Sequence, residues 1–394
     1  MRKINKIFFF TALVSLCFIG CAKKSISGDV KEFEILEKSE KVLTYSVKGL
    51  DDAKFELSCE PADLLKIDGL KIIGAKAGEG ILTVKEVSDN VLEKEIFFTV
   101  LPYSKEIVSV NGDKIEVPIK PKRVVTIAGT SDLVFLGIKP VAGMNFYSAG
   151  KFSEIFKGIS ELKETQPFDV EEIAKYNPDL IIYNKRMAIE NIEKLKDIAL
   201  VAPYDIEEPD SLKRLEGFCN IFDIDKNEIK QKIDSQEKKI AKIKQRLIDG
   251  GFDIANNTIS QGSYIPQMNG FMISGYTDFY INVIMFDKLG LTPQKKFGKE
   301  LLVDYGMGKE TEMPPKHAFM GPMEIAVDYI GDCFFLLGMS GAYPEQLHSD
   351  PIFSNTKTYK NKKVFPVDMV LLVDKSPLYL EEQANIIVDS LLKE

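Results

Sequence analysis

The chain has 394 residues, 45% of them hydrophobic and 28% charged, which is enough for two or three domains with hydrophobic cores of their own. Its formal net charge is -8, and loss of the three basic residues among residues 1–20 would bring it to about -11. An acidic chain lacks the basic face that nucleic acid requires, so we expect no nucleic-acid partner.

The N-terminus has the layout of a secretory signal. Arg2, Lys3 and Lys6 precede an apolar run at 7–19, which is too short to span a bilayer. Residues 18–21 (FIGC) resemble the lipobox of bacterial lipoproteins, with phenylalanine where leucine is usual. We expect a lipoprotein signal peptide at 1–20, lipidation at Cys21 and a tether at 21–31. The alternative is an ordinary signal peptide with a chance cysteine.

Three cysteines remain beyond this segment: Cys59, Cys219 and Cys333. Their wide spacing forms neither a disulfide framework nor a CxxC metal motif. We therefore expect buried thiols.

Residues 32–105 have the pattern of short strands separated by glycine turns. The clearest strands are predicted at 42–47, 54–57, 81–84 and 95–100. The stretch 72–84 resembles bacterial Ig-like repeats, which are small β-sandwiches. The resemblance implies a spacer or docking module.

Residues 106–225 alternate strand and helix, which predicts a parallel sheet covered by helices. Strands are expected at 123–127, 141–144 and 179–183, and helices at 132–136, with Ser131 as N-cap, and 170–176. Ligands of such sheets bind beyond the carboxyl ends of the strands. This rule places Thr130, Ser131, 145–148 and 184–186 at a binding rim.

A long helix is predicted at 227–247, where isoleucine and leucine recur at helical spacing. Gly250 and Gly251 end it. We expect residues 226–249 to connect an N-terminal lobe to a C-terminal lobe at 250–394. The alternative is a helix packed inside one domain.

Several short sequence motifs occur in the order typical of one protein family. They lie at 121–125, 136–143, 170–181, 350–353 and 361–365. This set resembles the periplasmic-binding proteins for ferric siderophores, haem and vitamin B12. The resemblance implies two doubly wound α/β lobes joined by one long helix, here preceded by the small all-β Ig-like sandwich. It implies a monomer without enzymatic activity that serves an ABC importer in the membrane.

Two exposed glutamates meet permease arginines in that family. Glu171 and Glu324 match those positions, and Glu172 replaces Glu171 if the register shifts by one residue. Carboxylates suit charge-assisted bonds to arginine. The alternative is a pair of solvated acids at helix starts.

The ligand is constrained by the scarcity of histidine. His317 and His348 are the two histidines, so capture of a bare metal ion is not expected. Cations and aromatic rings suit an anionic ferric chelate. The candidate ligand contacts are Tyr147, Lys185, Arg186, Tyr264, Tyr276, Met339 and Tyr343.

A ferric siderophore is the leading interpretation, and no resident cofactor is expected. Haem is the second, with Tyr147, Met144, Met339 or His348 as axial ligand, and cobalamin is the third. An enzyme and a surface adhesin are the two alternatives from other classes of protein. The sequence contains no G-x-S-x-G, Walker, H-E-x-x-H or G-x-G-x-x-G signature that would favour an enzyme. A surface adhesin would instead use residues 22–105.

Overall fold

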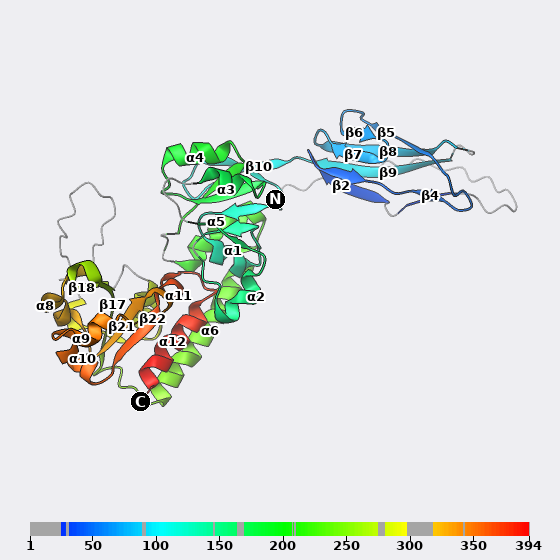
Figure 1. The fold of residues 1–394 in the computed structure, drawn as a ribbon. Helices are drawn as coiled ribbons and strands as arrows, with labels where there is room; N and C mark the ends of the chain where they lie inside the picture. The colour runs from blue at the N-terminus through cyan, green and yellow to red at the C-terminus, as the bar shows by residue number, and fades with distance from the viewer. Residues whose placement is uncertain are drawn as a thin grey trace. The chain divides into compact units, whose positions relative to one another are not determined.

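The structure is a computed structural model that describes residues 25–393, except 29–30, 89–91, 145, 164–168, 207, 209, 275–279, 298–317 and 342. The chain divides into unit 1, which ends at Tyr103, and unit 2, Ser104–Glu394 (Figure 1). The predicted signal peptide and Cys21 lie outside the described residues.

Unit 1 is built from two main β-sheets. One has the order β2-β9-β8-β5 and the other the order β3-β7-β6. Their strands are β2 (Glu32–Leu36), β9 (Leu92–Leu101), β8 (Gly78–Glu86), β5 (Phe55–Glu60), β3 (Glu40–Val42), β7 (Lys71–Gly74) and β6 (Leu65–Asp68). A small sheet pairs β1 (Ile26–Ser27) with β4 (Ser46–Val47). Alternate residues such as Leu82, Ile96 and Ile72 point into one shared core, as strand periodicity requires.

The prediction of one continuous strand at 42–47 is wrong. The chain forms β3, which pairs with β7, and then β4, which pairs with β1. Residues 43–45 cross between these sheets, and the Leu43 N–H still donates to the carbonyl of Leu70, in register with the β3–β7 ladder. The sequence pattern predicted extended chain here but not the change of partner strand.

Unit 2 begins with a β10–β11 hairpin (Ser104–Val108 and Lys114–Pro118), followed by a parallel sheet of order β14-β13-β12-β15-β16. The strands of this sheet are β12 (Val124–Thr126), β13 (Ala142–Gly143), β14 (Ser160–Glu161), β15 (Leu180–Asn184) and β16 (Leu200–Tyr204). Its helices are α1 (Thr130–Leu136), α2 (Ser153–Phe156), α3 (Val170–Ala174), α4 (Ile189–Lys196) and α5 (Ser211–Phe222). We call residues 104–225 the first half of unit 2.

Helices cover both faces of this sheet. Leu180 and Ile182 of β15 pack with Leu133 of α1 and with α5, whereas Ile181 packs with Ile173 of α3 and with α4. The alternation follows from the two-residue period of a strand and accounts for the continuous apolar run of β15. The parallel α/β organisation predicted for this region is confirmed.

The long predicted helix is α6 (Lys226–Asp249), and it joins two cores. Near its start, Ile229 belongs to the core of the first half. Further along, Ile240, Ile243 and Leu247 belong to a different core, shared with α12 (Leu380–Leu392). One amphipathic face of α6 therefore contributes to both cores of unit 2 (Figure 1).

Residues 250–393, the second half of unit 2, contain a mixed sheet of order β20-β18-β17-β21-β22, with β19 paired to β17. The strands are β17 (Thr258–Ile265), β18 (Gly270–Ser274), β19 (Thr292–Pro293), β20 (Ala318–Pro322), β21 (Cys333–Gly338) and β22 (Val364–Asp368). The helices are α7 (Tyr280–Asn282), the π-helix η3 (Val283–Lys288), α8 (Met323–Ala326), α9 (Glu345–Ser349), α10 (Lys357–Lys360), α11 (Met369–Val373) and α12. Successive residues of β21 point to opposite cores: Phe335 packs on one face and Phe334 on the other.

The predicted thiols are free cysteines. Cys219 and Cys333 are buried, and burial raises the pKa of the Cys333 thiol to about 11. Cys59 is half-buried, which departs from the expectation of full burial. Among the described residues, no helix combines the length and apolar character needed to cross a bilayer.

Candidate functional site

The turn between β12 and α1 lies at the carboxyl edge of the first sheet. Gly129 has a φ of +79° there, and a Cβ at this position would lie 2.4 Å from the Tyr204 ring. Glycine is the residue that satisfies both the left-handed backbone and the close approach. The turn leaves Thr130 and Ser131 in the first turn of α1, beside the neighbouring strand ends.

The predicted N-cap role of Ser131 is wrong. Gly129 is the N-cap residue and makes no side-chain cap bond. Ser131 lies inside the helix, is 3% exposed, and its Oγ is hydrogen-bonded to Asp374 Oδ2 at 2.8 Å. The serine therefore connects the first half of unit 2 to the second.

The segment that follows β13 is an aromatic loop at 146–159. Phe146, Phe152 and Phe156 of this loop are buried against Leu371 of α11 and Tyr379, which precedes α12. The two halves of unit 2 therefore share a small aromatic core at this point. Large aromatic rings packed edge to face resist sliding, so this contact holds the loop against the second half.

Tyr147 lies at the margin of that core and is half-buried. Its ring meets Tyr379 edge-on, with centroids 6.2 Å apart. Burial, followed by the charges of Asp368 and Glu382, raises the pKa of its phenol. Asp368 ends β22 and Glu382 lies on α12, so Tyr147 stands where the first sheet's edge meets the second half.

A buried ion pair supports the same junction. Arg214 of α5 is 2% exposed and its Nε donates to Asp132 Oδ2 at 2.9 Å, while Tyr204 donates to the same oxygen at 2.5 Å. Arg214 also donates to the carbonyl of Lys375 in the second half at 2.6 Å. A guanidinium suits this position because its rigid fork serves several acceptors at once.

The predicted cations of the first half differ in their surroundings. Lys185 follows β15 and pairs with Asp205 at 2.5 Å, so part of its charge is already neutralised. Arg186 is exposed, and its backbone N–H donates to Asn184 Oδ1 at 3.0 Å. Both lie at the carboxyl edge that was predicted to bind ligand.

The predicted contacts of the second half are more dispersed. Met339 follows β21 and is 65% exposed. Tyr264, near the end of β17, donates to Asn269 Oδ1 at 2.9 Å. Tyr343 stacks on His348 with centroids 4.3 Å apart, and burial raises the pKa of its phenol to about 12. Tyr276 and His317 lie outside the described residues.

The ring of His348, one of the predicted axial ligands of haem, already contacts two tyrosine side chains. Its Nδ1 lies 3.1 Å from the Tyr359 hydroxyl, and one face of its ring is covered by Tyr343. The ring therefore already has an edge partner and a stacking partner. Met144 is 6% exposed, so it is enclosed in the first half's core.

The two predicted docking glutamates occupy equivalent positions. Glu171 is exposed in the first turn of α3, where the Asp169 side chain caps the helix by accepting from the Glu172 N–H. Glu324 is exposed in the first turn of α8, beside Ile325, which is 51% exposed. Because α3 precedes the parallel strand β15 and α8 follows β20, both helix starts lie toward the carboxyl edges of their sheets.

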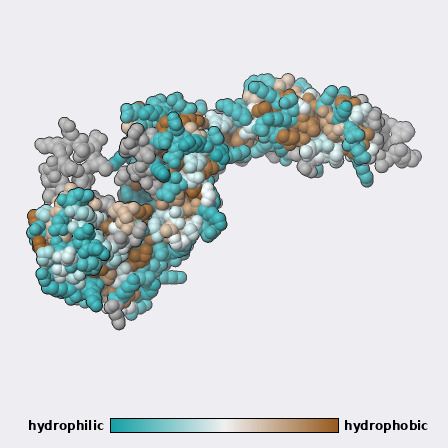
Figure 2. Space-filling model, viewed as in Figure 1, coloured by the Kyte–Doolittle hydropathy of each residue, from teal (hydrophilic) through white to brown (hydrophobic). Residues whose placement is uncertain are grey.

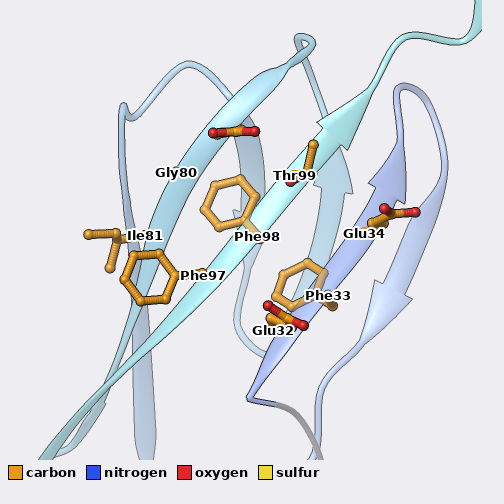
Figure 3. A pocket seen from close by; sticks show the side chains of 9 residues that line it. Glu32, Phe33, Glu34, Gly80, Ile81, Phe97, Phe98 and Thr99 are labelled. Atoms are coloured by element: carbon orange, nitrogen blue, oxygen red, sulfur yellow. The ribbon is translucent and has the colours of Figure 1, made fainter. Parts of the chain in front are cut away.

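A separate hollow lies on the four-stranded sheet of unit 1. Figure 3 shows its lining from β2, β8 and β9, with Phe97 standing out from β9. Phe97 is 64% exposed, and Glu32, Glu34 and Glu79 line the same hollow. Hydrophobic residues exposed among hydrophilic ones are visible on this unit in Figure 2. An acidic lining of this kind disfavours anionic ligands.

Comparison with solved structures identifies the architecture. A periplasmic binding protein of a Bacillus subtilis ferrichrome ABC transporter, described as FhuD fold-family, matches with a TM-score of 0.58 and 24% identity, covering 73% of this chain and 99% of that one. FhuD2 from Staphylococcus aureus with bound ferrioxamine B matches with a TM-score of 0.55 and 20% identity, covering 69% and 98%. The chain has the FhuD fold.

Curated relatives agree with the FhuD fold. The iron(3+)-hydroxamate-binding protein YxeB of Bacillus subtilis (strain 168) is 24% identical over 291 residues, covering 71% of this chain and 83% of YxeB. The iron(3+)-hydroxamate-binding protein FhuD of the same strain is 26% identical over 295 residues, covering 72% and 85%. No protein-family model matches the chain.

Sequence reasoning missed the residues that hold the two halves of the FhuD fold together. Asp374, Tyr379 and Arg214 were not singled out. A signal for Arg214 was present, because it shares a helix face with Phe218 and Ile221, both buried in α5. Asp374 and Tyr379 carried no comparable pattern, since their partners Ser131 and Tyr147 are over 230 residues away in the chain.

Proposed function

We propose that the protein is the extracytoplasmic solute-binding component of an ABC importer, and that it captures a ferric siderophore between the two lobes formed by the halves of unit 2. The observation that carries this proposal is the likeness, in sequence and in fold, to iron(3+)-hydroxamate-binding proteins over about seven tenths of the chain. These relatives are binding proteins by name, and we infer no enzymatic activity for this chain.

The geometry of unit 2 is consistent with chelate capture. The proposed ligand cleft lies between the carboxyl edges of the two sheets, because open α/β sheets bind ligands there. Tyr147 supplies an aromatic wall at this place, and Arg186 supplies an exposed cation. Aromatic walls and a cation fit a ferric chelate with an apolar shell and anionic oxygens.

Binding is tested by titrating the full chain with ferrioxamine B, a ferric catecholate, hemin and cobalamin. The chain contains 14 tyrosines and no tryptophan, so quenching of tyrosine fluorescence is the signal. We expect saturable quenching by a ferric siderophore. A Soret band on mixing with hemin, lost in Tyr147→Ala, would replace the siderophore by haem. Saturation by cobalamin alone would favour the third ligand class, and the absence of binding by all four would refute chelate capture.

We further propose that a lipid anchor at Cys21 tethers the protein outside the membrane, and that unit 1 acts as an Ig-like spacer. The basic start, the apolar run and the lipobox-like FIGC support the anchor. The two sheets around one core in unit 1 support a sandwich-type spacer. Metabolic labelling with a radioactive fatty acid tests the anchor: label is expected on the wild-type chain and not on Cys21→Ala.

Glu171 and Glu324 are proposed to dock the loaded protein on the permease. Their exposure and their place at the two carboxyl edges support this role. The double variant Glu171→Lys/Glu324→Lys is expected to abolish uptake while it leaves ligand affinity unchanged, because the charges meet permease arginines and not the chelate. A matched charge reversal at Glu190 of α4 and Glu345 of α9 serves as control. Equal loss of affinity and uptake would place the two glutamates in the cleft instead.

A further inference from the structure

The peptide of Tyr147 is held on both sides by one side chain from the second half. The hydroxyl of Tyr379 donates to the Tyr147 carbonyl at 2.7 Å and accepts from the Tyr147 N–H at 3.1 Å. Tyr379 is fully buried, so these bonds are made in a site from which water is excluded. The hydroxyl of Tyr379 therefore fixes the backbone of Tyr147, which is the candidate ligand contact of the aromatic loop.

The same phenol is connected to a carboxyl group through Ser131. The Ser131 Oγ lies 3.1 Å from the Tyr379 hydroxyl and 2.8 Å from Asp374 Oδ2. The other oxygen of Asp374, Oδ1, accepts from the Ser376 N–H at 2.8 Å. Oδ2 is therefore the oxygen on which a proton would enter this chain of hydrogen bonds.

The series of hydrogen bonds from Asp374 through Ser131 to Tyr379 is complete only when Asp374 is protonated. A serine hydroxyl and a phenol each carry one proton, and Tyr379 uses its own on the Tyr147 carbonyl. When Asp374 is protonated, Oδ2 donates to Ser131, which then donates to Tyr379. When Asp374 is ionised, it accepts the hydrogen bond of the Ser131 hydroxyl, and Ser131 then has no proton left to donate to Tyr379.

We propose that Tyr379 is a positioning residue of the ligand cleft. Its two hydrogen bonds to the Tyr147 peptide, which we call the clamp, hold the aromatic loop to the second half of unit 2, and protonation of Asp374 strengthens the clamp. The statement about ligand affinity rests on the proposed function, whereas the clamp is a property of the unliganded protein. The consequence for transport is a cleft that is more firmly pre-organised in acid than at neutral pH.

The surroundings of Asp374 favour its protonated form within the closed junction. Burial raises the pKa of its carboxyl to about 6, with a further contribution from the charge of Asp132. The hydrogen bonds from the Ser376 N–H and from Ser131, and then the charge of Arg214, oppose this shift. Arg214 is paired with Asp132, and Lys375 reaches the carbonyl of Ile206 at 3.3 Å. If the junction opens, Asp374 returns toward its usual pKa near 3.8. The ratio of open to closed forms should then rise about 10-fold between pH 5 and pH 7.5.

Amide hydrogen exchange of the unliganded full chain tests the clamp. Tyr379→Phe keeps the ring and removes the hydroxyl, so exchange at the Tyr147 amide should become about 2- to 10-fold faster, the effect of losing hydrogen bonds of ordinary strength. Tyr359→Phe, which removes a phenol bonded to His348, is the matched control and should leave this amide unchanged. Ser131→Ala gives a second variant should Tyr379→Phe fold poorly. Wild-type exchange at Tyr147 in both variants would overturn the proposal.

The role of Asp374 is tested by Asp374→Asn, whose amide donates to Ser131 as the protonated acid does. After correction for intrinsic exchange rates, wild-type protection at Tyr147 should fall from pH 5 to pH 7.5, and the variant should stay protected throughout. A pH dependence that persists in Asp374→Asn would refute control by this carboxyl.

Affinity for ferrioxamine B, measured by tyrosine quenching at pH 5 and pH 7.5, links the clamp to the cleft. We expect Tyr379→Phe to bind several-fold more weakly, with most of the loss in the dissociation rate. Wild-type affinity in a variant with faster exchange would show that the clamp does not position the ligand. A wild-type protein that binds no chelate but shows the exchange differences would refute the proposed function while the clamp stands.

Discussion

Replacement of Arg214 by methionine tests the buried ion pair at the junction of unit 2. The arginine side chain is 1% exposed and that of its partner Asp132 is 6% exposed. Methionine retains much of the volume but leaves the Asp132 carboxylate without its counter-ion. It also removes a donor to the carbonyls of Glu208 and Lys375. The loss of one partner from a buried pair costs about 3–5 kcal/mol, and we expect Arg214→Met to reduce the free energy of unfolding by about 4 kcal/mol.

Urea unfolding followed by ellipticity at 222 nm is a suitable assay. Within the part of the chain that the structure describes, every α-helix belongs to unit 2, so this signal reports its unfolding. The exposed pair of Arg246 and Asp389 provides a matched control, because Arg246→Met should change stability by less than about 1 kcal/mol. Asp132→Asn combined with Arg214→Met should be less destabilised than Arg214→Met alone, since no uncompensated charge remains.

One result would refute the reasoning. If Arg214→Met lost less than about 1 kcal/mol, the Asp132 carboxylate would have to be satisfied without the arginine. The hydrogen bond from Tyr204 would then be its principal support, and Tyr204→Phe in the Arg214→Met background would show the larger loss instead.

Three further predictions concern stability. Gly129→Ala should cost about 2 kcal/mol or more, because its φ of +79° strains an alanine and the added methyl meets the Tyr204 ring; thermal unfolding would show it. Leu247→Ala, in the core shared by α6 and α12, should cost about 2–5 kcal/mol in urea unfolding, whereas Ile248→Ala, 47% exposed, should cost little. The raised pKa of Asp374, about 6, implies a contribution to stability that is complete below about pH 4 and is lost as pH rises through 6. This contribution is about 3 kcal/mol in total, of which about 2 kcal/mol is lost between pH 4.5 and pH 7.5, and Asp374→Asn should flatten the dependence in that range.

Local periodicity predicted much of the fold. The apolar run before Tyr183 predicted a strand buried on both faces, and the spacing of Ile229, Ile240 and Leu247 predicted one long helix. These signals depend on residues close in the chain, where a period of two or of 3.6 residues reports which side chains share a face. The rule that ligands bind at the carboxyl ends of strands also predicted Tyr147 as a residue of the binding rim.

Tertiary structure alone decided which groups meet at the junction. Ser131 has the sequence signature of an N-cap, yet its hydroxyl bonds to Asp374, 243 residues later in the chain. The chain at 42–47 reads as one strand but changes sheets, because the partner strands β7 and β1 are selected by packing. Sequence patterns determine which residues are buried and in what element. Which partner a buried polar group finds depends on how distant elements pack. A hydrogen bond requires its donor and acceptor atoms to be placed to within a few tenths of an ångström, and no local sequence period specifies that placement.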